Sequence, residues 1–344
     1  MRRSWVEISL SRLRENVAAI QNRLSPSTRI IAVVKADAYG HGVEQISKCL
    51  FGCGVQDFAV ATLEEAVELR KYVTREKILV FGGCLEGEEG KFREHDLTAA
   101  LFDHRALSDE IKVEVKIDTG MTRLGIPWEE ALALVGRLKA QITGLYSHFA
   151  CADKDPDFTR LQLQRFEQAT SNLPYPRHIS DSAGLQFAEA HLDAVRLGLA
   201  LYGISPCPAV DYVKPALRWK TRILSVRDVL KGKPVGYCGT FITQRDSQVG
   251  VLPVGYADGY NRLFSNHGQV RVRGQLVPVL GSVSMDLTSV DLTDVPNPQV
   301  GEEVLLLEDS PDSPISAAGL SRTLGTIPYE VLTSLGNRVE RVYV

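Results

Sequence analysis

Short apolar runs alternate with segments of helical periodicity between residues 30 and 197, and this alternation constrains the fold most strongly. The runs are rich in Val, Ile and Ala, which is typical of strands buried on both faces of a parallel sheet. Eight such runs with helices between them predict a (β/α)₈ barrel of the TIM type. The expected strands are Ile30–Val34, Phe58–Ala61, Ile78–Phe81, Thr98–Phe102, Val113–Ile117, Ile142–Ser147, Arg177–Ile179 and Ala194–Leu197. The expected helices are Leu10–Leu24, Val43–Cys53, Leu63–Tyr72, Glu86–Glu94, Trp128–Lys139, Phe158–Thr170 and Gly184–Ala188.

One crossover of this predicted barrel is short. Only ten residues, Asp103 to Lys112, separate the fourth strand from the fifth. A parallel crossover usually needs about a dozen residues or more. We therefore expect the helix at this position to be a stub or absent.

The pattern changes after Tyr202. Residues 216 to 344 contain short alternating segments separated by Gly, Pro and Asp turns, which predicts an antiparallel β domain. A chain of 344 residues is long enough for two domains. We predict a barrel over residues 9–205, and a β domain over residues 206–344 that includes an N-terminal strand within residues 1–8. Pro206-Cys207-Pro208 is the expected hinge. The segments are Arg222–Val226, Gln248–Pro253, Gln269–Val272, Val277–Leu280 and Val304–Leu307.

Composition narrows the class of protein. Hydrophobic residues make up 44% of the chain and the net charge is −3, so a nucleic-acid partner is not expected. Glu7 interrupts the basic N-terminus before any apolar run, and no stretch reaches transmembrane length, so neither a signal peptide nor membrane association is expected. The six cysteines form no Cys-x-x-Cys pair. We predict reduced thiols, no metal site and a cytoplasmic protein.

Lys35 is the first candidate catalytic residue. It follows the buried run Ile30–Val34 and precedes a turn with Asp and two glycines, Ala36–Gly42. Barrel enzymes place catalytic groups at this end of the strands, and desolvation lowers the pKa of a lysine toward the nucleophilic range. The alternative is a solvated lysine at a strand end. The segment AVVKADAYGHG resembles the pyridoxal-phosphate attachment segment of the alanine racemases, which implies that Lys35 binds the cofactor covalently.

A second segment, VEVKIDTGMTRLG at residues 113–125, resembles the KVDTGMGRLG motif of this family. In that motif the lysine is often carbamylated, so the resemblance makes Lys116 a candidate carbamate that holds Arg123, which contacts the phenolic oxygen of the cofactor and the carboxylate of the substrate. A planar guanidinium suits this role because it engages two oxygens at once. Without the resemblance, Lys116 is expected to pair with Asp118 or Glu114.

Two further segments, residues 178–183 and 195–203, resemble the family signatures H-x-A-N-S and V-R-x-G-x-x-x-Y-G. Short loops and a helix N-terminus collect backbone N–H groups there, which suits a phosphate. The alternative for Ser182 is a plain helix N-cap. Asp181 replaces the asparagine of the family, so its carboxylate must point away from a phosphate or pair with a cation. The residues implied to bind the phosphate are Ser182, Gly198, Leu199, Tyr39 and Tyr329.

Arg196 carries the most mechanistic information. The resemblance places its guanidinium at the pyridine nitrogen of the cofactor, where many pyridoxal-phosphate enzymes have a carboxylate. Arginine keeps its proton, so the ring nitrogen stays largely unprotonated, which suppresses transamination. His178 is expected to support Arg196, and His148 is expected to anchor the cofactor site. Without the other motifs, each histidine would be interpreted as a hydrogen-bonded interior residue.

The β domain supplies the last motif, Gly255-Tyr256-Ala257-Asp258-Gly259, which resembles the G-Y-A-D-G motif of the family. Racemisation needs an acid or base on each face of a planar intermediate, and the resemblance assigns Lys35 to one face and Tyr256 to the other. An unperturbed tyrosine titrates near about pH 10, so Tyr256 needs a cationic neighbourhood. Met285 N–H is implied to bind the substrate carboxylate, with Asp286 as a supporting residue. The alternative for Tyr256 is an aromatic residue packed on a sheet.

The resemblance extends from Trp5 to the C-terminus. It implies a pyridoxal-phosphate-dependent alanine racemase that supplies D-alanine for peptidoglycan and works as a head-to-tail homodimer, with Tyr256 acting in the site of the partner chain. Glu340 stands where the family often has proline. A serine or broad-spectrum racemase remains open, because the size of the pocket selects the side chain. Less favoured are a decarboxylase of the same architecture, a non-catalytic pyridoxal-phosphate carrier, and a binding protein that has lost catalysis.

Overall fold

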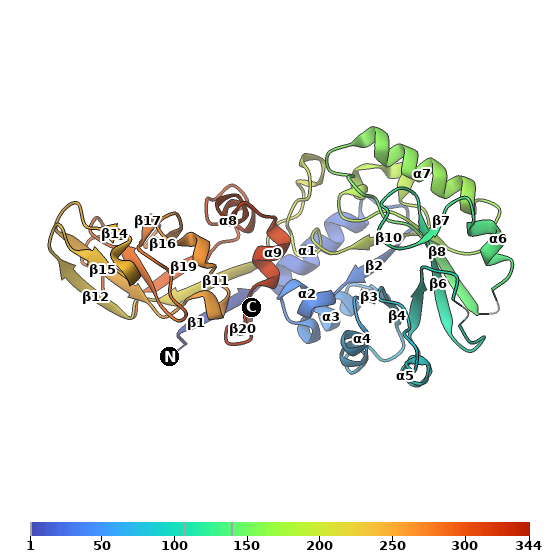
Figure 1. Ribbon diagram of the computed structural model, residues 1–344, viewed down its shortest axis with the longest axis horizontal. Coiled ribbons are helices and arrows are strands. Elements are labelled where there is room, and N and C mark those ends of the chain that lie inside the picture. The colour runs from blue at the N-terminus through green and yellow to red at the C-terminus, as the bar shows by residue number, and fades with distance from the viewer. Residues whose placement is uncertain (1, 106, 139) are drawn as a thin grey trace. The chain divides into compact units, whose positions relative to one another are not determined.

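The computed structural model describes residues 2–105, 107–138 and 140–344. The chain forms two compact units (Figure 1). One unit comprises Leu13–Val213, and the other combines the residues up to Arg12 with Lys214–Val344. The division after Val213 lies a little beyond the proline-containing segment 206–208.

The first unit is a nearly closed barrel of eight parallel strands in the order β10-β2-β3-β4-β5-β6-β8-β9. Backbone hydrogen bonds between β9 and β10 continue the circle: Arg196 N–H donates to Ser180 O at 2.9 Å and Asp193 N–H donates to Arg177 O at 3.1 Å. All eight predicted strands are present, each within one residue at either end. The strands are β2 (Arg29–Val33), β3 (Asp57–Val60), β4 (Lys77–Val80), β5 (Thr98–Leu101), β6 (Lys112–Asp118), β8 (Gln141–Tyr146), β9 (Arg177–His178) and β10 (Ala194–Leu197), with the short β7 (Ile126–Pro127) paired to β6.

Helices cover the outside of the barrel, with α3, α4 and α5 on one side of the strands and α7 on the other (Figure 1). Capping residues define where two of these helices begin. Thr62 and Glu65 form a capping box before α4, and Asp155 caps α7 ahead of Pro156. The helices are α1 (Leu10–Gln21), α2 (Lys35–Tyr39), α3 (Val43–Gly52), α4 (Leu63–Arg70), α5 (Glu89–Glu94), α6 (Ala131–Val135) and α7 (Pro156–Thr170), with the 3₁₀ turns η1 (Gly184–Gln186), η2 (Ala188–Ala190) and η3 (Pro208–Val210).

The crossover between β5 and β6 contains no helix in its described residues, 102–105 and 107–111, as its length predicted. Several predicted helices are longer than the observed ones, and two differ most. Trp128–Lys139 shortens to α6, with Lys139 outside the described residues, and Gly184–Ala188 is replaced by the 3₁₀ turns η1 and η2. A 3₁₀ turn is a common connector where too few residues are available for a full helix.

The second unit is built on a nine-stranded sheet in the order β12-β15-β18-β17-β16-β19-β11-β1-β20. Its pairs are antiparallel except that β1 runs parallel to β20, so the N-terminal strand belongs to this sheet, as expected. The predicted strand Arg222–Val226 is wrong, because this segment is the junction between β11 and β12. Glu340, at the proline position of the family, pairs with Arg2 across the β1–β20 edge at 2.8 Å. The strands are β1 (Ser4–Ile8), β11 (Leu217–Arg222), β12 (Ser225–Val229), β13 (Pro234–Val235), β14 (Phe241–Ile242), β15 (Ser247–Leu252), β16 (Gln269–Val272), β17 (Gln275–Leu280), β18 (Thr288–Asp291), β19 (Glu303–Leu307) and β20 (Glu340–Tyr343). The helical elements are η4 (Tyr237–Gly239), η5 (Tyr256–Asp258), η6 (Arg262–Phe264), α8 (Ala317–Leu324) and α9 (Pro328–Thr333).

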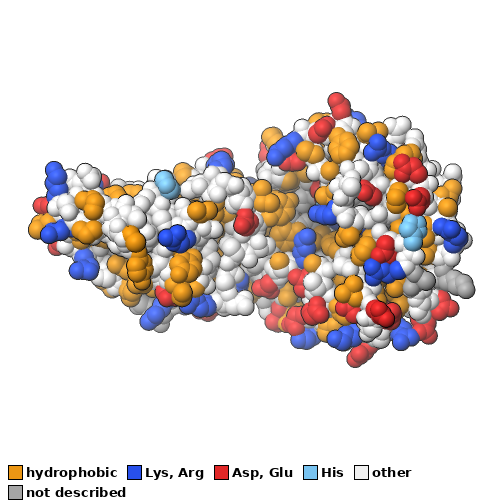
Figure 2. All heavy atoms as spheres, viewed as in Figure 1, with side chains coloured by type: hydrophobic (Ala, Val, Ile, Leu, Met, Phe, Trp, Pro, Cys, Tyr) orange, Lys and Arg blue, Asp and Glu red, His pale blue; other side chains and the backbone are white. Residues whose placement is uncertain are grey.

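The surface carries both signs of charge. Figure 2 shows basic and acidic side chains interspersed over the visible face of the barrel unit, in keeping with the small net charge of −3. Within the described residues, no helix has the length and apolar character needed to cross a bilayer.

Candidate active site

Lys35 begins the short element α2, two positions after the last residue of β2, Val33. Its side chain is half-buried. Burial lowers the pKa of Lys35, and the positive charge of Arg123 lowers it further, while Glu65 opposes the shift. The sequence predicted this position at the carboxyl end of a barrel strand, where such enzymes place reactive groups.

The turn after Lys35 is left-handed. Residues 36–39 have φ angles between 51° and 55°, and Gly40 follows at 77°. For residues other than glycine this conformation costs roughly 1–2 kcal/mol each, and it usually occurs at single positions. The sequence predicted a turn here, but not four consecutive non-glycine residues in this region.

Two carboxylates stabilise the left-handed turn. Glu65 accepts the N–H of Ala36 at 2.7 Å and the N–H of Ala61 at 2.8 Å. Asp37 accepts the N–H of Val43 at 2.7 Å, which joins the turn to the start of α3. Backbone strain held in place by its surroundings is concentrated at functional sites. The turn therefore holds the backbone next to Lys35 in a defined conformation.

Arg196, on β10, lies buried at the centre of a hydrogen-bond network. Its Nη1 lies 2.6 Å from Nδ1 of His178, and its Nη2 donates to Ser147 O at 2.5 Å and to Ile179 O at 3.0 Å. Nη2 also lies 3.1 Å from Nδ1 of His148. Among the described residues, Arg196 Nε makes no hydrogen bond, so one N–H of the clamped guanidinium is available to a ligand.

Both histidines of this network are neutral near pH 7. Burial lowers the pKa of His178 to about 4; Glu114 opposes this shift and the charge of Arg196 adds to it. Burial also holds the pKa of His148 well below its ordinary value, helped by Arg196 and Arg123. Each neutral ring therefore has a lone pair that can accept an N–H of Arg196.

The expectation that Lys116 pairs with Asp118 or Glu114 is wrong. The Glu114 carboxylate pairs with Lys77 and with His178 instead. Asp118 accepts backbone N–H groups of its own loop. Among the described residues, the Lys116 side chain forms no ion pair or hydrogen bond, because both nearby carboxylates are already engaged.

A cluster of four cations thus lies at the mouth of the barrel: Lys35, Lys116, Arg123 and Arg196. Burial, the charges of Arg123 and Arg196, and a smaller effect of Lys35 lower the pKa of Lys116 to about 8, although Asp118 opposes the shift. Arg123 is exposed on the loop after β6. Such an excess of positive charge suits an anionic ligand.

The loop after β10 forms a cradle of backbone N–H groups. The Ser182 hydroxyl accepts the N–H of Gly198 at 3.3 Å and the N–H of Ala200 at 3.2 Å. Among the described residues, Leu199 N–H makes no hydrogen bond. A Cβ at Gly198 would lie 2.4 Å from the hydroxyl of Tyr39, so a larger residue there would displace that ring.

Ser182 is not the helix N-cap that was considered as its alternative role. Ala183 precedes the 3₁₀ turn η1, and Ser182 contacts the loop after β10 instead. Asp181 accepts the N–H of Gly184 at 2.8 Å, and its other oxygen lies 3.9 Å from Nε2 of His148. Its carboxylate is therefore engaged by its own turn, and burial raises its pKa.

In the β unit, Tyr256 and Met285 belong to two loops that contact each other. Tyr256 N–H donates to Ser284 O at 3.1 Å, and Ala257 N–H donates to Met285 O at 3.0 Å. A Cβ on Gly255 would lie 2.2 Å from Ser284 O, so glycine permits this contact. The side chains of Tyr256 and Met285 are 43% and 52% exposed.

The remaining predicted residues lie around these loops. Asp286 accepts two N–H groups of Arg338 at 2.9 Å, and the same guanidinium lies 3.1 Å from Asp258. Tyr329, on α9, is 38% exposed. The structure thus groups Lys35, Tyr39, Lys116, Arg123, His148, His178, Ser182, Arg196, Gly198 and Leu199 in the barrel unit, and Tyr256, Met285, Asp286 and Tyr329 in the β unit.

Sequence reasoning missed the roles of Glu114 and Lys77. Glu114 was considered only as a partner for Lys116, whereas its buried carboxylate joins Lys77 to His178. A signal was present, because in VEVKID the polar residues Glu114 and Lys116 alternate with valines and so share one face of the strand. That face points into the barrel.

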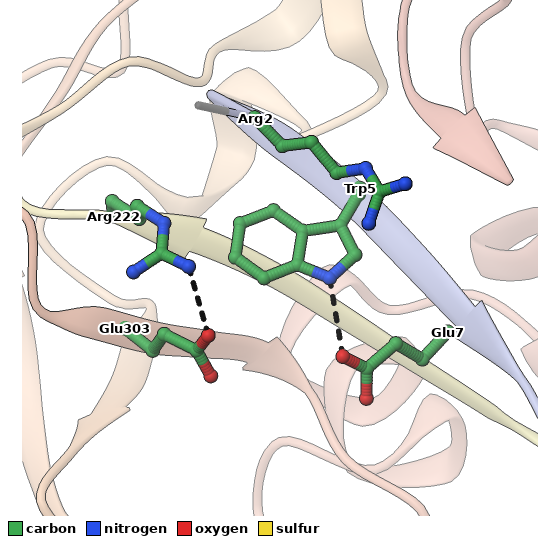
Figure 3. A pocket seen from close by; sticks show the side chains of 5 residues that line it. All are labelled: Arg2, Trp5, Glu7, Arg222 and Glu303. Atoms are coloured by element: carbon green, nitrogen blue, oxygen red, sulfur yellow. Dashed lines mark hydrogen bonds and ion pairs between the residues drawn. The ribbon is translucent and has the colours of Figure 1, made fainter. Parts of the chain in front are cut away.

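A depression in the β unit contains none of the predicted site residues. It is lined by Arg2, Trp5, Glu7, Arg222 and Glu303, and Figure 3 shows the indole between the Arg222–Glu303 pair and Glu7. The indole N–H donates to Glu7 at 3.2 Å, and Arg222 donates to Glu303 at 3.0 Å. The two arginines and two glutamates that line the depression therefore give it no net charge.

Comparison with known proteins agrees with this geometry. Residues 8–206 match the family domain described as alanine racemase, N-terminal domain, and residues 216–343 match the C-terminal domain. The chain is 40% identical to an alanine racemase of Syntrophobacter fumaroxidans over 98% of this chain and 96% of that protein. It is 41% identical to one of Thermodesulfovibrio yellowstonii, covering 98% of this chain and 97% of that protein.

Solved structures give the same result. The biosynthetic alanine racemase from Pseudomonas aeruginosa superposes with a TM-score of 0.89 at 33% identity, covering 100% of both chains. The alanine racemase from Bartonella henselae, solved with covalently bound pyridoxal phosphate, has a TM-score of 0.90 at 29% identity, again covering 100% of both chains.

A parallel barrel joined in one chain to a β unit, with family matches over both, identifies a two-domain amino-acid racemase, which is an isomerase. The chain belongs to the alanine racemase family.

Proposed function

We propose that the chain interconverts L-alanine and D-alanine with pyridoxal 5′-phosphate, using Lys35 and Tyr256 of a partner chain as its two bases. The observation that carries the proposal is the placement of a desolvated lysine in the same cation cluster as a clamped, buried Arg196. The family match and the relatives named alanine racemase support the choice of alanine.

The residues of the barrel fit the cofactor. The Leu199 N–H, which makes no hydrogen bond among the described residues, and the Ser182 hydroxyl lie on adjacent loops beside Gly198 and would suit a phosphate. Tyr39, which lies over Gly198, and Tyr329 would add hydroxyl donors. When bound, pyridoxal phosphate would delocalise negative charge from Cα of the amino acid.

Arg196 would set the electronic character of that cofactor. Its terminal nitrogens are held by protein atoms, which leaves Nε–H to donate to the pyridine nitrogen. A guanidinium keeps its proton, so the ring nitrogen would act as an acceptor and remain unprotonated. Weaker charge withdrawal would favour return of the proton to Cα over transfer to the cofactor, and transamination would be suppressed.

Lys35 would move the proton on one face of Cα. Burial lowers the pKa of its amine, so more of the free base is present near neutral pH than for a solvated lysine. Arg123 would bind the carboxylate of alanine, with Lys116 as a carbamate holding the guanidinium in place. Carbamylation requires a neutral amine, and a pKa of about 8 for Lys116 provides that form.

Tyr256 would move the proton on the opposite face. Its side chain is exposed, and the neighbouring Met285 N–H makes no hydrogen bond among the described residues, so both are available to a ligand. Asp286 supports this loop through Arg338. We infer a homodimer in which these groups of one β unit complete the barrel site of the partner chain.

The proposed product indicates the cellular role. D-Alanine is a building block of peptidoglycan, so we propose that the enzyme supplies it in the cytoplasm of a bacterium. The test is to incubate the purified protein with pyridoxal phosphate and L-alanine, and to measure D-alanine by chiral chromatography. We expect turnover of alanine to exceed that of serine. Faster turnover of L-serine would identify a serine or broad-spectrum racemase, and no turnover of either would contradict the proposal.

A further inference from the structure

Three side-chain contacts in series run through the barrel to Arg196. Lys77 Nζ pairs with one oxygen of Glu114, and the other oxygen lies 2.9 Å from Nε2 of His178. On the far side of the imidazole, Nδ1 lies 2.6 Å from Nη1 of Arg196. Glu114 and His178 are 1% and 2% exposed, so water does not replace these contacts.

The barrel topology brings the three residues of this contact series together. Lys77, Glu114 and His178 lie on β4, β6 and β9, which are alternate strands of the barrel, and alternate strands contribute inward residues to one layer. Gly144, opposite Glu114 on β8, leaves room for the carboxylate, because a Cβ there would lie 3.0 Å from its oxygen. Any larger residue would press on Glu114.

Donors and acceptors dictate where the protons lie. Arginine only donates, so Nδ1 of His178 must be an unprotonated acceptor. An ionised Glu114 only accepts, so Nε2 must carry the proton. Although burial alone would raise the pKa of Glu114, charge and hydrogen bonds from His178 and Lys77 outweigh burial and lower it. The His178 ring is therefore fixed in a single tautomer.

We propose that Glu114 and Lys77 are positioning residues for Arg196: Lys77 orients the Glu114 carboxylate, and Glu114 fixes the tautomer of His178 that accepts Nη1–H. Neither residue is among those that we assign to the proposed cofactor. The consequence for product partition rests on the proposed function, but the tautomer does not. Without this arrangement, the imidazole would point a donor at the guanidinium and weaken one side of its clamp.

The substitution Glu114→Gln tests the proposal because it preserves shape and changes the donor pattern. Lys77 attracts the amide oxygen, so the amide N–H₂ faces Nε2 of His178. The imidazole then has to place its proton on Nδ1, opposite Arg196. We expect ¹⁵N NMR of histidine-labelled holoenzyme to show the protonated nitrogen of His178 switching from Nε2 to Nδ1, with His178→Gln used to assign the signal among the seven histidines.

A double variant provides the rescue. In Lys77→Met/Glu114→Gln no cation orients the amide, so its oxygen can turn to His178 and restore the Nε2–H tautomer. The single variant Lys77→Met is the second test, because Lys77 is partly exposed and its replacement leaves the buried carboxylate in place. We expect that variant to raise the pKa of His178, since the charge of Glu114 is no longer neutralised.

Glu308→Gln is the matched control. Glu308 is also a buried carboxylate paired with a cation, Arg271, at 2.8 Å, but it lies in the other unit. We expect it to leave the His178 signals unchanged. A His178 that keeps the Nε2–H tautomer in folded Glu114→Gln would overturn the proposal, as would an unchanged pKa in Lys77→Met.

A functional readout follows from the same variants. With alanine, Glu114→Gln should make several-fold more pyruvate per racemisation than the parent, and the double variant should return toward the parent ratio. If Glu114→Gln switches the tautomer but the wild-type protein has no racemase activity, the positioning role of Glu114 is supported and the proposed function is contradicted. If Glu114→Gln racemises alanine normally and keeps the Nε2–H tautomer, the proposed function is supported and the positioning role of Glu114 is contradicted.

Discussion

Nη1 of Arg196 and Nδ1 of His178 lie 2.6 Å apart in the interior of the barrel. The short contact joins a guanidinium to a neutral imidazole, because burial lowers the pKa of His178 to about 4 despite the opposing effect of Glu114. Two backbone carbonyls hold Nη2 at the same time. The orientation of Arg196 is therefore set by the barrel before any ligand binds, and within the part of the chain that the structure describes only Nε–H is left without a partner.

The first prediction concerns the charge at this position. Arg196→Glu should retain cofactor binding, because the phosphate cradle at Ser182 and Gly198 is separate from the guanidinium. It should increase transamination, since a carboxylate stabilises a protonated pyridine nitrogen and strengthens charge withdrawal. The measurement is pyruvate formed per alanine racemised. Arg245→Glu, an exposed arginine of the β unit, is the matched control. An unchanged ratio in a cofactor-loaded variant would show that Arg196 does not set the partition.

The second prediction concerns Lys35. The purified protein should be yellow, and borohydride should remove the visible band while fixing the cofactor to Lys35. Lys35→Ala should lose the covalent label and reduce racemisation by several orders of magnitude, because it removes both the attachment point and one base. Lys48→Ala, on the exposed side of α3, should keep both. A peptide map with the label on another lysine would disprove the assignment.

The barrel could be predicted from the sequence because each strand is an apolar run that can be recognised from its local sequence alone. Ile30–Val34 shows this: the observed β2 is displaced by one residue. The same apolar runs placed Lys35 just after the first predicted strand and Arg196 within the last one. Helix lengths were less predictable, and α6 is shorter than its apolar periodicity suggested, because packing rather than periodicity decides where a helix ends.

The polar contacts of the site could not be predicted in the same way. Glu114 has two possible lysine partners, Lys116 two residues away and Lys77 on a strand that is not its neighbour, and only the barrel's layers decide between them. The left-handed turn at 36–39 was equally hidden, because it depends on a carboxylate from α4, Glu65. Long-range contacts of this kind have no local sequence signature.

The third prediction concerns carbamylation of Lys116. Its pKa of about 8, lowered first by burial and then by Arg123 and Arg196, leaves a useful fraction of neutral amine near pH 7. Labelled ¹³C-bicarbonate should therefore give a carbamate signal, and the negative charge should attract Arg123. Lys116→Ala should abolish the signal, and Lys77→Met should not. If the wild-type protein shows no carbamate, Arg123 needs another anion, and Asp118 is the nearest in sequence.

The fourth prediction concerns stability in acid. The unfolded state protonates His178 near about pH 6.5, whereas the folded state holds its pKa at about 4, because the imidazole is buried next to Arg196. Between these values the unfolded state binds more protons, so stability is present above about pH 6.5 and is lost as the pH falls toward 4. The loss from this one group is up to about 3 kcal/mol.

Urea unfolding of wild type and His178→Gln at pH 7.5 and pH 4.5 measures this effect. The variant should be less stable than wild type at the higher pH, because Glu114 and Arg196 lose their partner. Its stability should also fall less between the two values. Equal slopes for both proteins would mean that His178 titrates normally in the folded state.

The last prediction concerns the assembly. We expect Lys35→Ala and Tyr256→Ala to be nearly inactive alone and to regain activity when co-expressed. If Tyr256 acts in the site of the partner chain, a mixed dimer has one site with both bases and one site with neither. Random pairing and independent sites then give up to about a quarter of wild-type activity. If Tyr256 acts within its own chain, every site of the mixed dimer lacks one base.

The control for this experiment is the heterodimer itself, isolated with two different affinity tags, so that a failure of mixing is not mistaken for a failure of complementation. Co-expressing Lys35→Ala with Lys35→Met should give no recovery, because both chains lack the same base. Each site then contains an intact Tyr256 but lacks Lys35. Recovery in the first pair and not in the second would locate the two bases on different chains. An inactive isolated heterodimer of Lys35→Ala and Tyr256→Ala would rule out the shared site.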